Sequence, residues 1–171
     1  GAYLTSLEMA DRALALEGSP QGKTAWFTKP YHTTPEGQLP DYRGYPAMPD
    51  ERANAVVEEA FANGWQVLSH CNGDAAADQF IAAVERAAAI HRSADRRPVM
   101  VHAQTVREDQ LDRMATLGIL PSFFASHVYY WGDYHRDVVM GPERAARISP
   151  MRSARRRGLR REVVHQLVQR G

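Results

Sequence analysis

The chain has 171 residues, a length that suits one domain with a buried core. Hydrophobic residues make up 44% and charged residues 24%, which excludes collagen-like, disordered and disulfide-scaffold proteins. The net charge is +1, so no global field attracts nucleic acid or an anionic membrane. No apolar run approaches the ~20 residues that span a bilayer. The single cysteine, Cys71, favours a reducing, cytoplasmic compartment.

The amino-terminal third combines a weakly periodic segment with a long loop. Residues 1–12 could hold a short helix, and residues 13–16 could be a strand or a helix end. Prolines and glycines punctuate residues 17–49, and a loop of this length in a compact domain is functional or disordered. Aromatic residues in it argue against disorder. They are Trp26, Phe27, Tyr31, Tyr42 and Tyr45.

Helices and strands alternate from residue 50 onward. Helical periodicity alternates with short apolar runs, which predicts a parallel sheet with helices outside it. Thr105 and Glu108 are spaced as a capping box at the start of one helix, and Gly64 and Gly118 are helix stops. The predicted helices are 50–63, about 75–92 and 105–117, and the predicted strands are 65–69, 98–101 and 119–124.

The carboxyl-terminal segment is rich in arginine. Pro142 can start a helix, and six of the residues 152–161 are arginines. This run is either a solvated helix face or a surface that binds phosphates or a partner. Apolar residues at 163–168 predict a last amphipathic helix.

Three consecutive predicted strands end in or run into histidine, at His70, His102 and His127. Sites in barrels and open α/β sheets form at the carboxyl ends of the strands, and imidazole is a good ligand for zinc and related metals. Two of these histidines could share one ion. The alternative is that each histidine caps an element or packs in the core.

The segment 70–74 (His-Cys-Asn-Gly-Asp) carries further candidates. Asp74 can cap the following helix, or it can orient His70. Cys71 is a thiol ligand, a nucleophile or a buried inert thiol, and the absence of a second cysteine in the sequence favours the last.

The segment 126–135 mixes aromatic rings with polar groups. Such a mixture suits a pocket wall, or else a loop packed over the mouth of a barrel. His127 and His135 are eight residues apart in this predicted loop, so the sequence does not fix their separation in space.

Several ordered motifs resemble the YtcJ-like branch of the amidohydrolase superfamily, amidohydrolase family 3. They cover most of residues 17–158. The motifs are Glu17-Gly-Ser-Pro-Gln-Gly-Lys-Thr-Ala-Trp26, Lys29-Pro-Tyr31, His70-Cys-Asn-Gly-Asp74, Val101-His-Ala-Gln104, His127-Val-Tyr-Tyr-Trp-Gly-Asp133, Gly141-Pro-Glu-Arg144 and Ile148-Ser-Pro150.

The resemblance implies an α/β fold that is a partial (β/α)₈ TIM barrel, roughly strands 4–7 with their helices. A complete barrel needs ~250 residues. The whole chain 1–171 is then one partial barrel domain, family-like over 17–158 and divergent over 159–171.

The resemblance also implies the reaction and the roles of individual residues. The family hydrolyses amide-type C–N bonds of small molecules with one or two divalent metals, usually zinc. By resemblance, His70 and His102 would be metal ligands, and His127 and Trp131 would contact substrate. Two further residues, Asp74 and Gln104, would hold the metal ligands in place without binding the metal themselves.

The sequence departs from the family pattern at several catalytic positions. No His-x-His pair occurs, Ala13 stands where many relatives carry a bridging lysine, and Leu167 stands where the general-base aspartate is expected. The chain is therefore expected to be an internal or truncated fragment, weakly active or inactive alone. The alternatives are an oligomer that completes a site across chains and a non-catalytic interaction module that docks through Arg152–Arg161.

Overall fold

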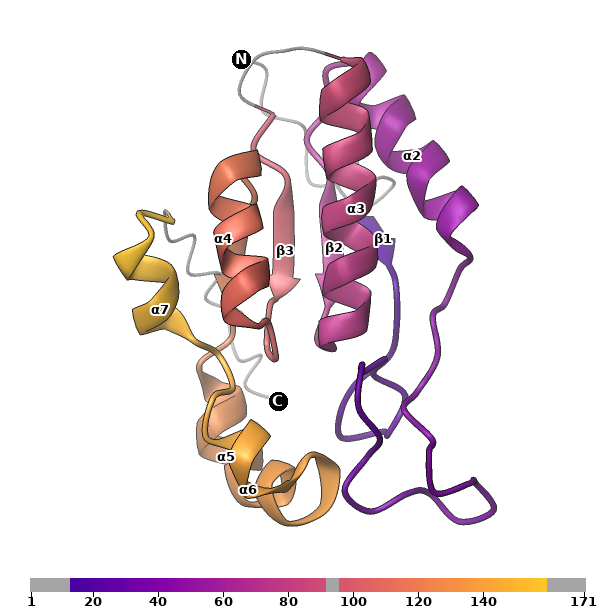
Figure 1. Cartoon of the computed structure of the whole chain (residues 1–171), viewed down its shortest axis with the longest axis vertical. Coiled ribbons are helices and arrows are strands. Elements are labelled where there is room, and N and C mark those ends of the chain that lie inside the picture. Colours follow the sequence, from indigo (N-terminus) through magenta and orange to yellow (C-terminus); the bar gives the residue numbers. More distant parts are fainter. Residues whose placement is uncertain (1–12, 92–95, 160–171) are drawn as a thin grey trace, which may run out of the picture.

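The computed structural model describes residues 13–91 and 96–159 (Figure 1). Its centre is a four-stranded parallel sheet in the order β1-β2-β3-β4. The strands are β1 (Ala13–Ala15), β2 (Leu68–Cys71), β3 (Val99–His102) and β4 (Leu120–Phe123). Because neighbouring strands are parallel, all their carboxyl ends lie at one edge of the sheet. The prediction of a parallel α/β arrangement is confirmed.

Three helices lie over one face of this sheet (Figure 1). They are α2 (Asp50–Ala62), α3 (Asp74–Ile90) and α4 (Glu108–Leu117). The main core lies between them and the strands, where Phe80, Ile81 and Met100 are completely buried. The predicted helix stops are confirmed at Gly64 and Gly118, which both adopt the left-handed φ that favours glycine.

The predicted capping box at the start of α4 is wrong. Arg107 is the N-cap residue, and its backbone N–H donates to Oε1 of Gln110 at 2.9 Å. The Thr105 hydroxyl instead donates to the carbonyl of Asn72 at 2.6 Å. Thr105 therefore bonds to the neighbouring βα turn, and Gln110 rather than Glu108 caps the start of α4.

The long loop 17–49 is ordered by its aromatic residues, as predicted. Phe27 and Tyr31 are buried in a second small core with Val139 and Met140. The rings of Phe27 and Tyr31 are 4.9 Å apart. This core holds the loop against the segment that follows β4.

The segment 126–139 is helical, which corrects the prediction of a loop. It forms α5 (Ser126–Tyr134) and continues as η1 (His135–Val139), a π-helix. Its aromatic residues and Gly132 are poor helix formers, but inward-facing His127, His135 and Val139 are buried, so packing overrides local propensity. Two short helices follow, α6 (Gly141–Ala145) and α7 (Met151–Arg156).

Helices α5 and α6 lie beyond the carboxyl ends of the strands (Figure 1). The helices predicted for residues 1–12 and 163–168 lie outside the described residues, as does Leu167. Among the helices that the structure describes, none has the length and apolar character that a membrane span requires.

Candidate functional site

Four histidine rings form a row at the carboxyl edge of the sheet. His70 and His102 stand near the ends of β2 and β3, and their ring centroids are 4.7 Å apart. His127, in the first turn of α5, is 5.2 Å from His102, and His135 of η1 is 6.5 Å from His127. The parallel topology brings together residues from two strands and the segment after a third.

Burial lowers the pKa of all four imidazoles. Desolvation is the main cause, and for His102, His127 and His135 repulsion from neighbouring imidazoles adds to it. The pKa falls to about 4 for His102, His127 and His135. The rings are therefore neutral at pH 7, the form in which imidazole binds a metal or accepts a hydrogen bond.

Asn72 holds His70, a role that the sequence did not reveal. Its side-chain nitrogen lies 3.2 Å from Nε2 of His70 and donates to the carbonyl of Gly18 at 3.1 Å. Nδ1 of His70 is buried without a hydrogen-bond partner in the described part of the chain. Because the amide nitrogen of Asn72 can only donate, Nε2 of His70 accepts and the buried Nδ1 carries the ring hydrogen, which a hydrogen-bond acceptor on a ligand could satisfy.

A buried carboxylate fixes the turn that carries His70. Glu17 is 5% exposed, and its side chain accepts backbone N–H groups of Trp26, Asn72 and Gly73. Burial raises its pKa to about 7, against the opposite effect of these donors. The sequence shows Glu17 only as part of a motif, because its partners are as many as 56 residues away.

The turn after β3 has an unusual backbone. His102 has φ 71° and Ala103 has φ 45°, both in the left-handed region that favours glycine. Gln104 follows and is completely buried, with its side-chain nitrogen 2.9 Å from Nε2 of His135. Gln104 thus lies beside the histidine row, and its side-chain contact is with His135 rather than with the predicted ligands His70 and His102.

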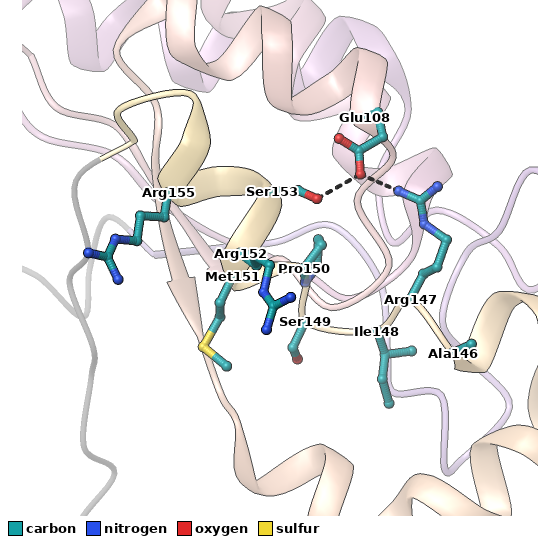
Figure 2. Close-up of a pocket in the computed structure, with 10 residues that line it drawn as sticks. All are labelled: Glu108, Ala146, Arg147, Ile148, Ser149, Pro150, Met151, Arg152, Ser153 and Arg155. Carbon is teal, nitrogen blue, oxygen red and sulfur yellow. Dashed lines mark hydrogen bonds and ion pairs between the residues drawn. The ribbon is translucent and has the colours of Figure 1, made fainter.

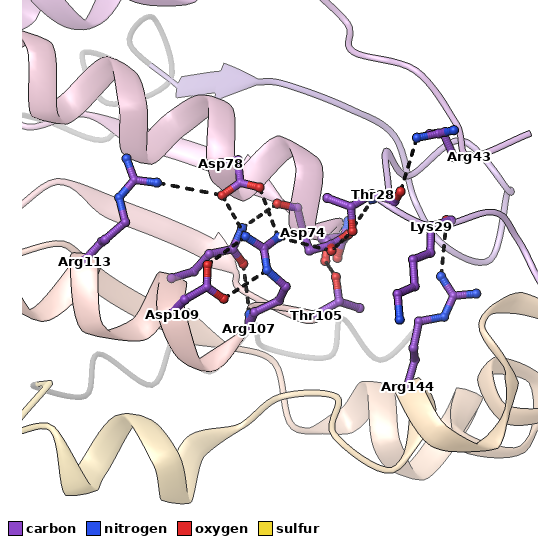
Figure 3. Close-up of polar contacts among 12 residues, drawn as sticks. Thr28, Lys29, Arg43, Asp74, Asp78, Thr105, Arg107, Asp109, Arg113 and Arg144 are labelled. Atoms are coloured by element: carbon purple, nitrogen blue, oxygen red, sulfur yellow. Dashed lines mark hydrogen bonds and ion pairs between the residues drawn. The ribbon is translucent and has the colours of Figure 1, made fainter.

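Asp74 neither caps α3 nor contacts His70 through a hydrogen bond. Gly73 is the N-cap residue of α3, so the prediction that Asp74 caps this helix is wrong. The Asp74 carboxylate accepts the backbone N–H of Thr28 at 2.9 Å and lies 3.3 Å from Arg107 (Figure 3). A bond from the Thr28 hydroxyl reinforces this contact. Asp74 therefore fastens the loop 17–49 to the start of α4.

Cys71 is placed as a core residue. It is completely buried, and burial raises the pKa of its thiol well above the usual range. A thiolate nucleophile or ligand is unfavourable at this position, and the interpretation as an inert buried thiol fits the structure.

The two predicted substrate contacts are placed differently. His127 is buried, and its ring neighbours are His102, Phe124 and His135. Trp131 is 42% exposed, and its ring neighbour is Tyr134. The two residues are four apart on α5, a spacing that puts them on the same side of an α-helix, so helical periodicity does not explain their difference in burial.

Part of the arginine-rich run binds acidic groups of α4. Arg157 pairs with Glu108 and Asp112, each at 2.6 Å. Glu108 also accepts bonds from Ser153 and Arg147 beside a pocket of about 680 Å³ (Figure 2). These contacts fix α7 against α4, whereas Arg160 and Arg161 lie outside the described residues.

The histidines fit part of a metal centre. His70 and His102 supply two neutral imidazoles, but catalytic zinc sites have three protein ligands. Within residues 13–91 and 96–159, no cluster of three or more histidine, cysteine, aspartate or glutamate side chains could hold a metal ion. Further ligands would have to come from outside this part of the chain.

Comparisons with known proteins identify the family and the fold. Residues 5–161 match the model of a family described as the amidohydrolase family. The fold is similar to crystal structures of uncharacterized metal-dependent hydrolases from Pyrococcus furiosus and Pyrococcus horikoshii OT3. The TM-scores are 0.72 and 0.71, each with 24% identity over 90% of this chain.

The match covers only part of those two proteins. The chain spans 30% of the first and 29% of the second. The similarity thus supports the prediction of a partial barrel. No curated protein matches the sequence.

Proposed function

The chain belongs to the amidohydrolase family, and on that premise we propose that it carries part of a metal-dependent hydrolase for amide-type C–N bonds. One observation carries the proposal. The rings of His70 and His102 are 4.7 Å apart at the carboxyl ends of adjacent parallel strands. This is the edge at which barrel enzymes place their chemistry.

His70 and His102 would hold a divalent metal, which we propose to be zinc. Both rings are neutral at pH 7, so each offers a lone pair without first losing a proton. When bound, such a metal lowers the pKa of water and polarises a carbonyl group. Asn72 and Glu17 would keep His70 in place, because they fix the turn behind it.

His127 would contact a small amide substrate beside these ligands, since its ring lies next to His102. Trp131, which is 42% exposed on α5, would contribute a further contact, and Gln104 would support His102 through its contact with His135. Asp74 would act indirectly, by holding the loop 17–49 over the strand ends. We place the protein in the YtcJ-like branch and in the cytoplasm, on the motifs and the single buried cysteine.

This chain alone is expected to have little or no hydrolase activity. Two imidazoles make an incomplete catalytic site, and the sequence has no His-x-His pair. An assay of the metal-loaded chain on a panel of N-acyl amides should give no turnover above that of His70→Ala. Metal-dependent turnover that His70→Ala abolishes would overturn the proposed incompleteness, but not the proposed reaction.

Metal binding tests the ligands directly. A Co²⁺ titration followed by visible absorbance should show weak binding that both His70→Ala and His102→Ala abolish. The matched control is His32→Ala, because His32 is an exposed histidine outside the row and its loss should leave binding unchanged. Equal cobalt binding by the wild-type chain and His70→Ala would refute the ligand assignment.

Assembly of several copies is an alternative way to complete the site. Sedimentation velocity of the metal-loaded chain distinguishes the two cases, because a well-behaved monomer contradicts assembly. The non-catalytic alternative has less support, since Arg157 of its docking surface already pairs with Glu108 and Asp112. A salt-sensitive complex with a partner would favour it.

A further inference from the structure

At the His135 end of the histidine row, two buried polar side chains contact each other. Gln104 and His135 are both completely buried, and their side-chain nitrogens lie 2.9 Å apart. Gln104 follows His102 by two residues, and the ring of His135 lies 6.5 Å from that of His127. The contact therefore joins the turn after β3 to the segment that carries His127.

This contact also determines which ring nitrogen of His135 carries the hydrogen. The amide nitrogen of Gln104 can only donate, so Nε2 of His135 accepts and Nδ1 carries the ring hydrogen. Nδ1 of His135 and Oε1 of Gln104 are buried with no hydrogen-bond partner in the described residues. A pair with two unsatisfied atoms is a poor choice for stability, because apolar side chains of the same shape would avoid their desolvation cost.

The backbone on both sides of the contact is unusual. His102 and Ala103 have positive φ immediately before Gln104, and His135 begins a π-helical segment. Left-handed non-glycine residues persist only where the surroundings enforce them, and short π-helical segments are frequent at functional sites. The Gln104 carbonyl also accepts the backbone N–H of Ser149 at 2.7 Å, so both ends of this residue are held.

We propose that Gln104 and His135 form a positioning pair that sets the distance between the rings of His102 and His127. The pair would hold a metal ligand against a substrate-facing imidazole without touching either metal or substrate. The inference rests on the proposed function for the roles of His102 and His127, but the geometry it claims exists in the metal-free chain.

Nuclear magnetic resonance of the metal-free, ¹⁵N-labelled chain tests this geometry. Long-range ¹H–¹⁵N spectra should show His135 as the Nδ1–H tautomer, and the rings of His102 and His127 should give an NOE. Gln104→Met keeps the size of the side chain but removes the donor, so the NOE should disappear. His135→Gln retains an acceptor and should keep the NOE, which provides a second variant if the first folds poorly.

The matched control is Gln79→Met. Gln79 is another buried glutamine. It lies on α3, outside the histidine row, and donates to the Met48 carbonyl and to Asp50 at the start of α2. A purely structural role predicts that Gln104→Met and Gln79→Met lower the unfolding temperature similarly and leave the NOE intact. That result, or a wild-type chain without the NOE, would overturn the positioning pair.

Cobalt binding separates this inference from the proposed function. If the proposed function and the positioning pair are both correct, Gln104→Met should weaken Co²⁺ binding ~10-fold. This is the lower end of the usual effect of substituting a residue that supports a metal ligand. If Co²⁺ leaves the His70 and His102 signals of the wild-type chain unchanged, the metal assignment fails while the NOE result still stands. If Co²⁺ binds but neither the NOE nor the affinity responds to Gln104→Met, only the positioning pair fails.

Discussion

The turns after β2 and β3 deliver histidines to the same edge of the sheet by different means. The first turn contains Gly73 and rests on the buried carboxylate of Glu17. The second has two left-handed non-glycine residues, His102 and Ala103, and no carboxylate is hydrogen-bonded to them in the described structure. Thr105 joins the two turns through the Asn72 carbonyl.

This difference shows two ways to place a side chain precisely at a strand end. In the first turn, no residue has a positive φ, and the ionisable carboxyl group of Glu17 from the loop 17–49 holds the backbone. In the second, backbone strain of about 1–3 kcal/mol per residue is held in place by neutral hydrogen bonds. The first turn should therefore respond to steric change and pH, and the second mainly to the loss of individual bonds.

The largest effect is expected from Gly73→Ala, which breaks the first turn. A Cβ here would lie 1.9 Å from the Trp26 carbonyl oxygen and 2.7 Å from Oε2 of Glu17. Because the nearest obstacle is backbone, the substitution should lower the free energy of unfolding by ~4 kcal/mol. Urea denaturation measures it.

Gly132→Ala is the control for Gly73→Ala. Gly132 lies in α5, and a Cβ added there would meet nothing within 4 Å apart from its chain neighbours and the backbone of its own helix, so alanine should raise stability by ~0.5–1 kcal/mol. If both alanine variants were equally stable, the close approach of the loop to the first turn would be refuted.

The pH dependence of stability should come next in size. Glu17 has a folded pKa of about 7, above the ordinary glutamate value of 4.5, so the folded chain binds more protons between these values. Stability contributed by protonated Glu17 is thus present below pH 4.5 and lost as pH rises through 7. The loss should be of order 3 kcal/mol between these limits.

Glu17→Gln isolates this contribution. The variant cannot ionise at position 17, so its free energy of unfolding should decline less between about pH 5 and pH 8. The absolute stability of this variant is not the test. Its amide N–H groups would face backbone N–H groups whose hydrogen bonds the carboxylate accepts in the wild-type chain. Parallel pH profiles for the two proteins would contradict the assignment.

Thr105→Val tests the link between the turns. The valine keeps the shape but loses the 2.6 Å hydroxyl bond to Asn72, while the Thr105 N–H still donates to the same carbonyl at 3.0 Å. The expected loss is ~1 kcal/mol. Thr116→Val is the control, since the Thr116 hydroxyl bonds within an exposed helix and its removal should change stability by less than ~0.5 kcal/mol.

The sequence predicted the strand ends better than their supports. Alternating apolar runs and helical periodicity located β2, β3 and β4 to within about three residues, and so placed His70, His102 and His127 at one edge. Asn72 and Glu17 were missed because their partnership joins residues 55 apart, which no local pattern encodes. Helix α5 was missed because its burial, and not its composition, makes it helical.

The smallest effect is expected from Ala103→Gly, which tests strain in the second turn. Glycine would relieve the positive φ of 45°, a gain of ~1 kcal/mol or more. It would also increase the entropy of the unfolded chain, a cost of ~0.5–1 kcal/mol. These terms oppose one another, so the free energy of unfolding should change by less than ~1 kcal/mol.

The comparison with Ala115→Gly makes this small change interpretable. Ala115 is exposed within α4 and has no positive φ, so glycine there should cost ~1 kcal/mol in full. The entropy term is common to both substitutions, and the difference between them therefore measures strain at Ala103. If the two variants lost equal stability in urea denaturation, the second turn would hold its histidine without strain, and the contrast between the two turns would reduce to the presence of Glu17.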